Sequence, residues 1–365
     1  MRSLQQYYRA LRNFAGKTRI IVSRYHQRGF RNYYLDQLIW GSDALDNPML
    51  LQPKCLGNKN EGKLIYVIRF PKGWIPTAGF FALLNRTLCG VDFADRMGFV
   101  PVVDNWDCCS YEEDVPVNGS KIVFEYYFEP LSEVSLKDAL NSKNVVASSN
   151  PNMDISLIEN QSEWFHLSNK YIEEMGRIYE KYFRLNPIVK EQMSNDIDGV
   201  LRKKHMLGVH FRGTDYKLNV NGHPVSLEIS DYYPIIDAAM KKYHFDGIFL
   251  ASDEMSAIKA ISKRYKNVVF YKDVYRAEGN VSVAFSKDER TLHKYRLGYE
   301  VLRDSYTLAA CDGLIAGYSQ VSVGARINKC SQNKRYRFCY IIDKGVNHNG
   351  VDWVKYYNEN VNSQK

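Results

Sequence analysis

His210 and Arg212 stand at the end of a short apolar stretch and could hold a phosphate group. The stretch, MLGVHF at residues 206–211, is typical of a buried strand, and side chains two residues apart on a strand point to the same face. Ligands collect at the carboxyl ends of strands in open α/β sheets, and arginine binds phosphate oxygens through two parallel hydrogen bonds. The pattern predicts a diphosphate clamp, with Gly213 allowing close backbone approach. The alternative is an arginine that pairs with Asp215 to close a turn.

Two further places have the polar residues of a nucleotide site. The turn SQVS, which contains Ser319, Gln320 and Ser322, follows a predicted strand and opens a predicted helix. Amides and hydroxyls at such a positive helix end bind anions, whereas the simpler interpretation is a serine helix cap. Asp253 and Glu254 end another predicted strand, where ligand groups cluster, although Asp253 could instead cap the next helix.

The sequence HFRGTDY at 210–216 resembles the H-x-R-x-x-D motif of the GDP-fucose-dependent fucosyltransferase superfamily. That group includes bacterial nodulation and core α1,6-fucosyltransferases and protein O-fucosyltransferases. Three other blocks resemble the same superfamily in its order, and together they cover roughly residues 62–330: they are 79–104, 247–254 and 298–322. The resemblance implies a GT-B fold, a GDP-fucose donor, phosphate contact at the serine turn, and Gly79 and Asn85 facing the cleft.

This chain differs from the α1,6-fucosyltransferases at two positions that bear on linkage and catalysis. The α1,6 enzymes carry a second arginine directly after the first, where this chain has Gly213. They also have a glutamate, thought to act as base, where this chain has Val220. The linkage and the base therefore do not carry over. His223, in the loop NGHP, is the first candidate base, ahead of Asp215 and Glu228, although a loop histidine is more often incidental.

Asp304 falls in a predicted helix among apolar neighbours, where an acid is costly unless it is paired. Its functional role would be to accept hydrogen bonds from guanine N1 and N2, or to orient the clamp. The alternative is a surface carboxylate one step round the helix.

No metal site is predicted. Asp196-Ile197-Asp198 matches a D-x-D pattern that holds divalent metals in another glycosyltransferase class, but it lies at the end of a polar helix and is interpreted as solvated surface. Cys108 and Cys109 are adjacent, with no second cysteine pair near them.

The elements that position these residues alternate along the chain. The first part has predicted strands at 63–70 and 99–104 around a helix at 80–97, then an extended or mixed segment at 121–128. Helices at 163–182 and 187–203 bridge to a second part, whose predicted strands are 206–211, 247–252, 267–271, 313–318 and 336–342. Helices separate those strands, which implies a parallel sheet with right-handed crossovers.

We therefore predict an α/β, GT-B-like fold in which two Rossmann-like domains with parallel sheets face each other across a cleft. The expected divisions are a basic arm and irregular segment at 1–60, an acceptor-side domain at 61–203, a nucleotide-sugar-binding domain at 204–345, and a tail at 346–365.

Charge and composition limit the kinds of partner that this protein could bind. Of the formal net charge of +8, all lies in residues 1–32, which have eight Lys or Arg and no acidic residue. This arm could lie on an anionic membrane or cover its own domain, and no other basic stripe indicates nucleic acid. The chain begins without a signal-peptide pattern, and its seven cysteines are odd in number and fit no disulfide framework. We expect a cytoplasmic bacterial enzyme, peripheral at the membrane if the arm binds there.

The predicted activity is an inverting, metal-independent transfer of fucose from GDP-fucose to a bacterial surface glycan or its precursor, either an oligosaccharide or a lipid-linked glycan. No cofactor is expected, since the GDP-sugar is a substrate. The same fold with another nucleotide sugar, or a non-catalytic binding module, are the alternatives. An NAD-dependent oxidoreductase is disfavoured because no G-x-G-x-x-G follows any predicted strand.

Overall fold

The computed structural model describes residues 53–70, 75–147, 166–202, 204–277 and 282–361, together with a few residues between Leu4 and Ala15. Most of the expected basic arm and irregular segment at 1–60 lies outside the described residues. Among the described helices, none has the length and apolar character that a membrane span needs.

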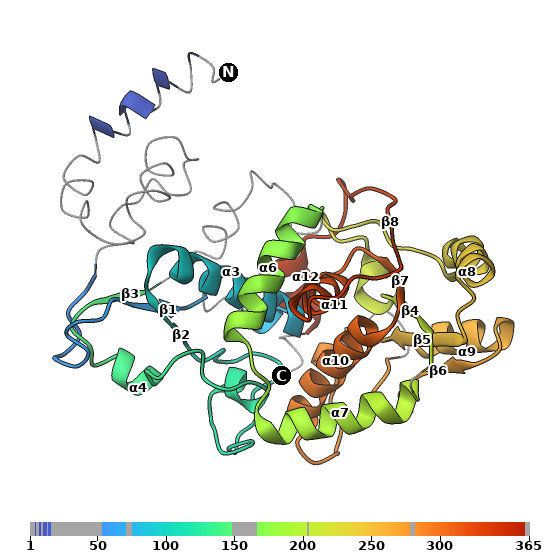
Figure 1. Cartoon of the computed structure of the whole chain (residues 1–365), viewed down its shortest axis with the longest axis horizontal. Coiled ribbons are helices and arrows are strands. Elements are labelled where there is room, and N and C mark those ends of the chain that lie inside the picture. Colours follow the sequence, from blue (N-terminus) through green and yellow to red (C-terminus); the bar gives the residue numbers. More distant parts are fainter. Residues whose placement is uncertain are drawn as a thin grey trace.

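The first sheet is small, parallel and three-stranded. Its order is β2-β1-β3, formed by Val100–Val103, Ile65–Ile68 and Val145–Ala147. Helix α3 (Phe80–Met97) connects β1 to β2, and short helix α4 (Leu136–Ala139) precedes β3. Figure 1 shows this part in blue to green, beside the larger second sheet.

The segment 121–128, expected to be extended or mixed, is partly helical, and the third strand comes later. Val123–Tyr126 form a 3-10 turn that brings the rings of Phe124 and Phe128 into a stack, with centroids 5.1 Å apart. A strand would separate these two side chains by roughly 13 Å, because it rises about 3.3 Å per residue. Packing of the aromatic side chains into the core, including Trp106, therefore overrides the local preference for a strand.

The second sheet is parallel with the order β6-β5-β4-β7-β8, as the alternation of strands and helices predicts. The strand bounds are Val268–Val269, Gly247–Ser252, Met206–Phe211, Gly313–Gly317 and Phe338–Ile342. The helices are α8 (Ile229–Tyr243), α9 (Met255–Arg264), α10 (His293–Ala310) and α11 (Gln320–Ser331). The predicted α/β class with two parallel sheets is confirmed.

This strand order has a topological switch point between β4 and β7. From β4 the chain builds outward to β5 and β6, and it then returns to the other side of β4 as β7. Crevices that bind ligands open at the carboxyl ends of strands at such a point. Arg212 follows β4 and Ser319 follows β7, so the strand order alone brings these two residues to one crevice.

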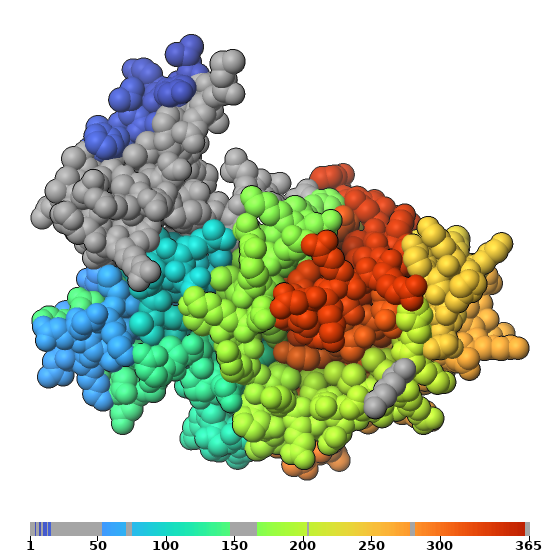
Figure 2. Space-filling view, viewed as in Figure 1, coloured from blue at the N-terminus to red at the C-terminus, as the bar shows by residue number. Residues whose placement is uncertain are grey.

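Two helices join the halves of the molecule. They are α6 (Asn169–Tyr182) and α7 (Pro187–Leu201), and Asn186 caps α7 through its side chain with Pro187 in the first turn. Figure 2 shows residues 166–202, in light green, lying across the boundary between the blue-to-teal part and the yellow-to-red part. One hydrophobic core includes Phe80 and Phe81 of α3 together with Leu297 of α10, so the halves share buried surface.

The interpretation of Asp196 as solvated surface is wrong. Its carboxylate accepts hydrogen bonds from the Arg303 guanidinium at 2.9 Å and the Tyr299 hydroxyl at 2.8 Å. Arg303 is only 3% exposed and also pairs with Asp273, so Asp196 supplies charge that a buried guanidinium requires. Asp198, two residues on, is exposed.

Candidate active site

A cavity of about 290 Å³ opens where the two parallel sheets end. The loops after β1, β4, β5 and β7 contribute to its wall, as does one side of α10. Nine of the predicted site residues line it: Gly79, His210, Arg212, Asp215, His223, Asp253, Asp304, Ser319 and Gln320. The predicted residues Asn85, Gly213 and Ser322 are not among the residues that line it.

Arg212 is held between two carboxylates. One terminal nitrogen donates to Asp253 Oδ2 at 2.5 Å and the other donates to Asp215. Burial lowers the pKa of Arg212, but the two carboxylates outweigh it and the pKa is raised, so the guanidinium stays charged. The predicted pairing with Asp215 is present. It does not exclude a clamp, because a guanidinium has five N–H donors and these two bonds use two of them.

Asp253 organises the loop behind the fork instead of capping a helix. Its carboxylate accepts hydrogen bonds from the Gly213 amide at 3.0 Å and the Thr214 hydroxyl at 2.7 Å, in addition to Arg212. Glu254 occupies the N-cap position of α9, without a capping hydrogen bond from its side chain. Asp253 therefore fixes the position of the fork relative to the end of β5.

Gly213 makes room for Glu254. A Cβ placed on Gly213 would fall 2.1 Å from Glu254 Oε2, so a side chain at this position requires the carboxylate to move. Glu254 is held there by Lys217, whose Nζ donates to Oε1 at 2.6 Å.

His210 and the serine turn form the part of the wall between β4 and β7. His210 is buried, and its Nδ1 lies 3.4 Å from the Ser319 hydroxyl. Burial lowers the pKa of His210 to about 4, so the imidazole is neutral near pH 7. Ser319 and Ser322 cap α11 reciprocally, each side chain accepting from the other's backbone amide at 3.0–3.1 Å. The predicted serine cap is thus present, and Ser319 also faces the cavity.

The N-termini of two helices converge on the cavity, one from each half of the chain. Helix α11 begins at Gln320, and α3 begins at Phe80 directly after Gly79. Asn85, which was expected to face the cleft, instead links them: its Nδ2 donates to the Gln320 carbonyl at 3.1 Å. Each helix end contributes partial positive charge. Together with Arg212 they make the cavity suited to an anion.

Helix α10 presents two carboxylates, Glu300 and Asp304, one turn apart on the cavity wall. Glu300 is satisfied by Arg290 and by the Tyr275 amide at 3.1 Å. Asp304 is 9% exposed, and no hydrogen bond joins its carboxylate to another described residue. Burial raises the pKa of Asp304 to about 7, against the opposing effect of Arg303 and Arg276. Asp304 is thus a buried acid on the cavity wall that accepts no hydrogen bond from the part of the chain that the structure describes.

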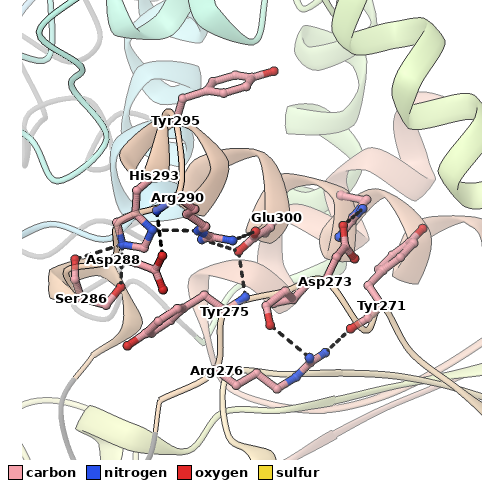
Figure 3. Close-up of polar contacts among 12 residues, drawn as sticks. Tyr271, Asp273, Tyr275, Arg276, Ser286, Asp288, Arg290, His293, Tyr295 and Glu300 are labelled. Carbon is pink, nitrogen blue, oxygen red and sulfur yellow. Dashed lines mark hydrogen bonds and ion pairs between the residues drawn. The ribbon is translucent and has the colours of Figure 1, made fainter.

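The loop beside these acids is tied to α10 by a polar network (Figure 3). Arg290 donates to Glu300 and, through Nε, to His293 Nδ1 at 2.8 Å. His293 Nε2 lies 3.1 Å from the Ser286 hydroxyl. Arg276 donates to the Tyr271 carbonyl at 2.7 Å. These contacts tie residues 271–277 and 286–293 to helix α10, and so they position the wall around Asp304.

Of the three candidate bases, His223 has the best position. It lies on the cavity wall, and burial lowers its pKa against the opposing effect of Asp215. Asp215 is on the wall but is paired with Arg212 and hydrogen-bonded by Thr214 at 2.9 Å. Glu228 caps α8 in a reciprocal bond with Asp231 and is not on the wall. A neutral imidazole is the form that accepts a proton.

Within the described residues, no group of three or more His, Cys, Asp or Glu side chains is arranged to hold a metal ion.

Comparison with known proteins gives structural matches only. No protein-family model and no curated protein matches the sequence. The fucosyltransferase NodZ from Bradyrhizobium matches with a TM-score of 0.41 and 15% identity, over 73% of this chain and 93% of that one. POFUT1 in complex with GDP-fucose matches with a TM-score of 0.43 and 12% identity, over 75% of this chain and 97% of that one.

Several wall residues were not predicted. Arg86, Tyr111, Phe285 and Trp353 all line the cavity. Arg86 lies about two helical turns after Gly79, on the same side of α3. Helical spacing from Gly79 could therefore have predicted it. Trp353 lies in the segment expected to be a tail, and no local pattern connects it to the motifs.

Proposed function

We propose that this protein is a glycosyltransferase that transfers fucose from GDP-fucose, with inversion and without a metal ion, to a bacterial surface glycan or its precursor. The observation that carries the proposal is the position of Arg212. It stands at the topological switch point of the second sheet, in a cavity that also receives the N-termini of α3 and α11.

This arrangement suits a departing nucleoside diphosphate. As the bond between the sugar C1 and the phosphate oxygen breaks, negative charge builds on the β-phosphate. Fixed donors at that position lower the barrier, because they need no reorganisation during the reaction. Arg212 and the two helix ends supply such donors from the protein itself.

Asp304 is suited to the guanine base. An ionised carboxylate accepts hydrogen bonds from two N–H groups at once, which matches guanine N1 and N2. Asp304 has no competing partner among the described residues, and the neighbouring wall includes Val301, Val274 and Tyr275, which give apolar surface for a ring. Adenine and uracil do not present the same pair of donors.

His223 is the proposed general base. In an inverting transfer the acceptor O–H gives its proton to the base while the oxygen bonds to C1 and GDP leaves. A neutral imidazole can take that proton, and Asp215, which favours the protonated form of His223, would stabilise the imidazolium that results.

GDP is expected to stabilise the protein selectively. Ligand at a hundredfold excess over Kd adds ~2.7 kcal/mol, which raises Tm by roughly 5 °C. UDP and ADP should give much smaller shifts, because Asp304 rejects their bases. GMP should be weaker than GDP, because it lacks the β-phosphate. A response to UDP alone would remove the guanine assignment, and equal responses to GMP and GDP would remove the diphosphate clamp.

Transfer from GDP-fucose is expected to survive excess EDTA. The positive charge that a metal would bring to the diphosphate is assigned here to Arg212 and two helix N-termini. The measurement is GDP release in the presence of acceptor, before and after chelation. Turnover that is lost on chelation and restored by Mn²⁺ would contradict metal independence while leaving the nucleotide site in place.

A non-catalytic nucleotide-binding module is the second candidate. It has the same thermal-shift profile with GDP but releases no fucose from GDP-fucose, with or without acceptor. The presence of His223 on the wall favours the enzyme, because a binding module needs no base.

A further inference from the structure

The C-terminal segment, expected to be a tail, is built into the candidate active site. Residues 345–351 run beside the loop 219–225, which carries His223. Five backbone hydrogen bonds of 2.8–3.1 Å join the two, with donor and acceptor pairs Val225–Gly345, Asn347–His223, Gly222–Asn347, Asn221–Val351 and Val351–Asn219. The Asn347 side chain adds bonds to the carbonyls of His223 and Pro224 at 3.3 and 3.2 Å. The position of His223 therefore depends on this segment.

The same segment then crosses to the first half of the chain. Asp352 caps helix α12 (Trp353–Asn360) by accepting from the Lys355 amide at 2.8 Å. The indole Nε1 of Trp353 donates to the Thr77 carbonyl at 3.2 Å, in the loop that leads to α3. Trp353 is thus held from both halves.

Trp353 presents apolar aromatic surface to the cavity. Its single hydrogen-bond donor is used on Thr77, so its side chain has no polar group left for a ligand. The ring of Phe285 lies next to it, with centroids 6.1 Å apart, and both residues line the cavity. Phe285 also contacts Tyr357 of α12, at 5.2 Å between centroids, which fixes the pair.

We propose that Trp353 and Phe285 form the subsite for the acceptor, and that the acceptor group bound there is a sugar ring. The inference rests on the proposed function. Sugars expose C–H groups that pack on aromatic rings and hydroxyls that need polar partners, and a pocket that combines both orients such a ligand. His223 and Trp353 line the same cavity and are held by one segment, so a ring packed on the aromatic pair can present a hydroxyl to the base.

The test uses the full chain saturated with GDP and a panel of methyl glycosides of hexoses and N-acetylhexosamines. Saturation-transfer NMR is expected to show signals on the ring C–H protons of at least one glycoside with the wild type. Trp353→Ala should weaken that glycoside by at least about tenfold, whereas Trp353→Phe, which keeps an aromatic ring, should retain most of the binding. Val354→Ala, an exposed position on the same helix, is the matched control.

GDP affinity and Tm separate the outcomes. Trp353→Ala should keep the Kd for GDP within about twofold of the wild type, which shows that the fold and donor site persist. Failure of the wild type to bind GDP would refute the proposed function instead. With GDP bound, the subsite is overturned if no glycoside binds the wild type or if Trp353→Ala binds glycosides normally. A loss of GDP affinity in both Trp353 variants would mean that the Trp353 ring contacts the GDP-sugar donor and not the acceptor.

Discussion

Replacing Arg212 by lysine is expected to lower kcat by about 10²–10³-fold, nearly as much as replacing it by alanine. Lysine keeps the charge but offers a point donor, whereas arginine offers a planar fork. In this structure the fork already spans Asp215 and Asp253, so its remaining donors are held in a fixed orientation toward the cavity. The loss should fall on kcat as well as on GDP affinity, because the bond to phosphate strengthens as charge develops there.

Both substitutions should also lower Tm. The Arg212 side chain is 25% exposed and its two partners are 13% and 11% exposed, so a partner left alone is a costly, partly buried charge. Activity must therefore be measured per folded molecule, by kcat, GDP Kd and Tm on the same preparations.

Arg96 provides the matched control. It also bridges two carboxylates, Asp92 and Glu174, and its side chain is 29% exposed, but it lies outside the cavity wall. Arg96→Lys should lower Tm and leave kcat and GDP affinity unchanged. If Arg212→Lys behaves like Arg96→Lys, with a lower Tm but a normal kcat, then Arg212 has only a structural role. The hypothesis that it binds the diphosphate would then be wrong.

Asp304→Asn is expected to weaken GDP binding by roughly 10–100-fold, since a hydrogen bond to a charged group contributes about 1.5–3 kcal/mol. The variant should also lose its preference for GDP over IDP, because IDP lacks the exocyclic N2 donor that the carboxylate would bind. Titration calorimetry with both nucleotides measures the two effects together. A variant that still prefers GDP by the wild-type factor would remove Asp304 from the base site.

The same substitution should stabilise the unliganded protein at high pH. In the unfolded chain Asp304 ionises near its usual pKa, while burial holds the folded pKa at about 7. Between these two pKa values the folded state binds one proton more than the unfolded state. Asp304 therefore makes the free energy of unfolding fall as the pH rises. The full cost of burying the ionised carboxylate is present above pH 7. The upper bound of this cost is on the order of 4 kcal/mol.

Asparagine carries no such penalty, so Asp304→Asn should melt several degrees above wild type near pH 8 and close to wild type near pH 4. Wild-type GDP affinity should fall as pH is lowered through about 7, because the protonated carboxyl accepts less well. Glu300→Gln gives the contrast: it breaks an ion pair with Arg290 and should destabilise. A lower Tm for Asp304→Asn at both pH values would mean that the carboxylate is structural.

Much of the second sheet could be predicted from local pattern. Its strands are short apolar runs separated by amphipathic helices, and that periodicity depends only on neighbouring residues. Since the strands are parallel, the residues after them gather at one edge, which is why Arg212, Asp253 and Ser319 were chosen correctly as wall residues. Strand β3, with three residues, was missed because so short a run carries almost no periodic signal.

The sequence by itself determined the α/β class, the alternation of the second sheet, and most of the polar residues at its carboxyl edge. Only the tertiary structure decided which partners these residues have: Asp253 for Arg212, 41 positions away, and Thr77 for Trp353, 276 positions away. It also decided that Glu254 occupies the space beside Gly213 and that the Asp304 carboxylate accepts no hydrogen bond from another described residue. Periodicity records which face of an element is buried. Contacts between distant segments depend instead on sheet order, register and the path of connecting loops, which no local pattern encodes.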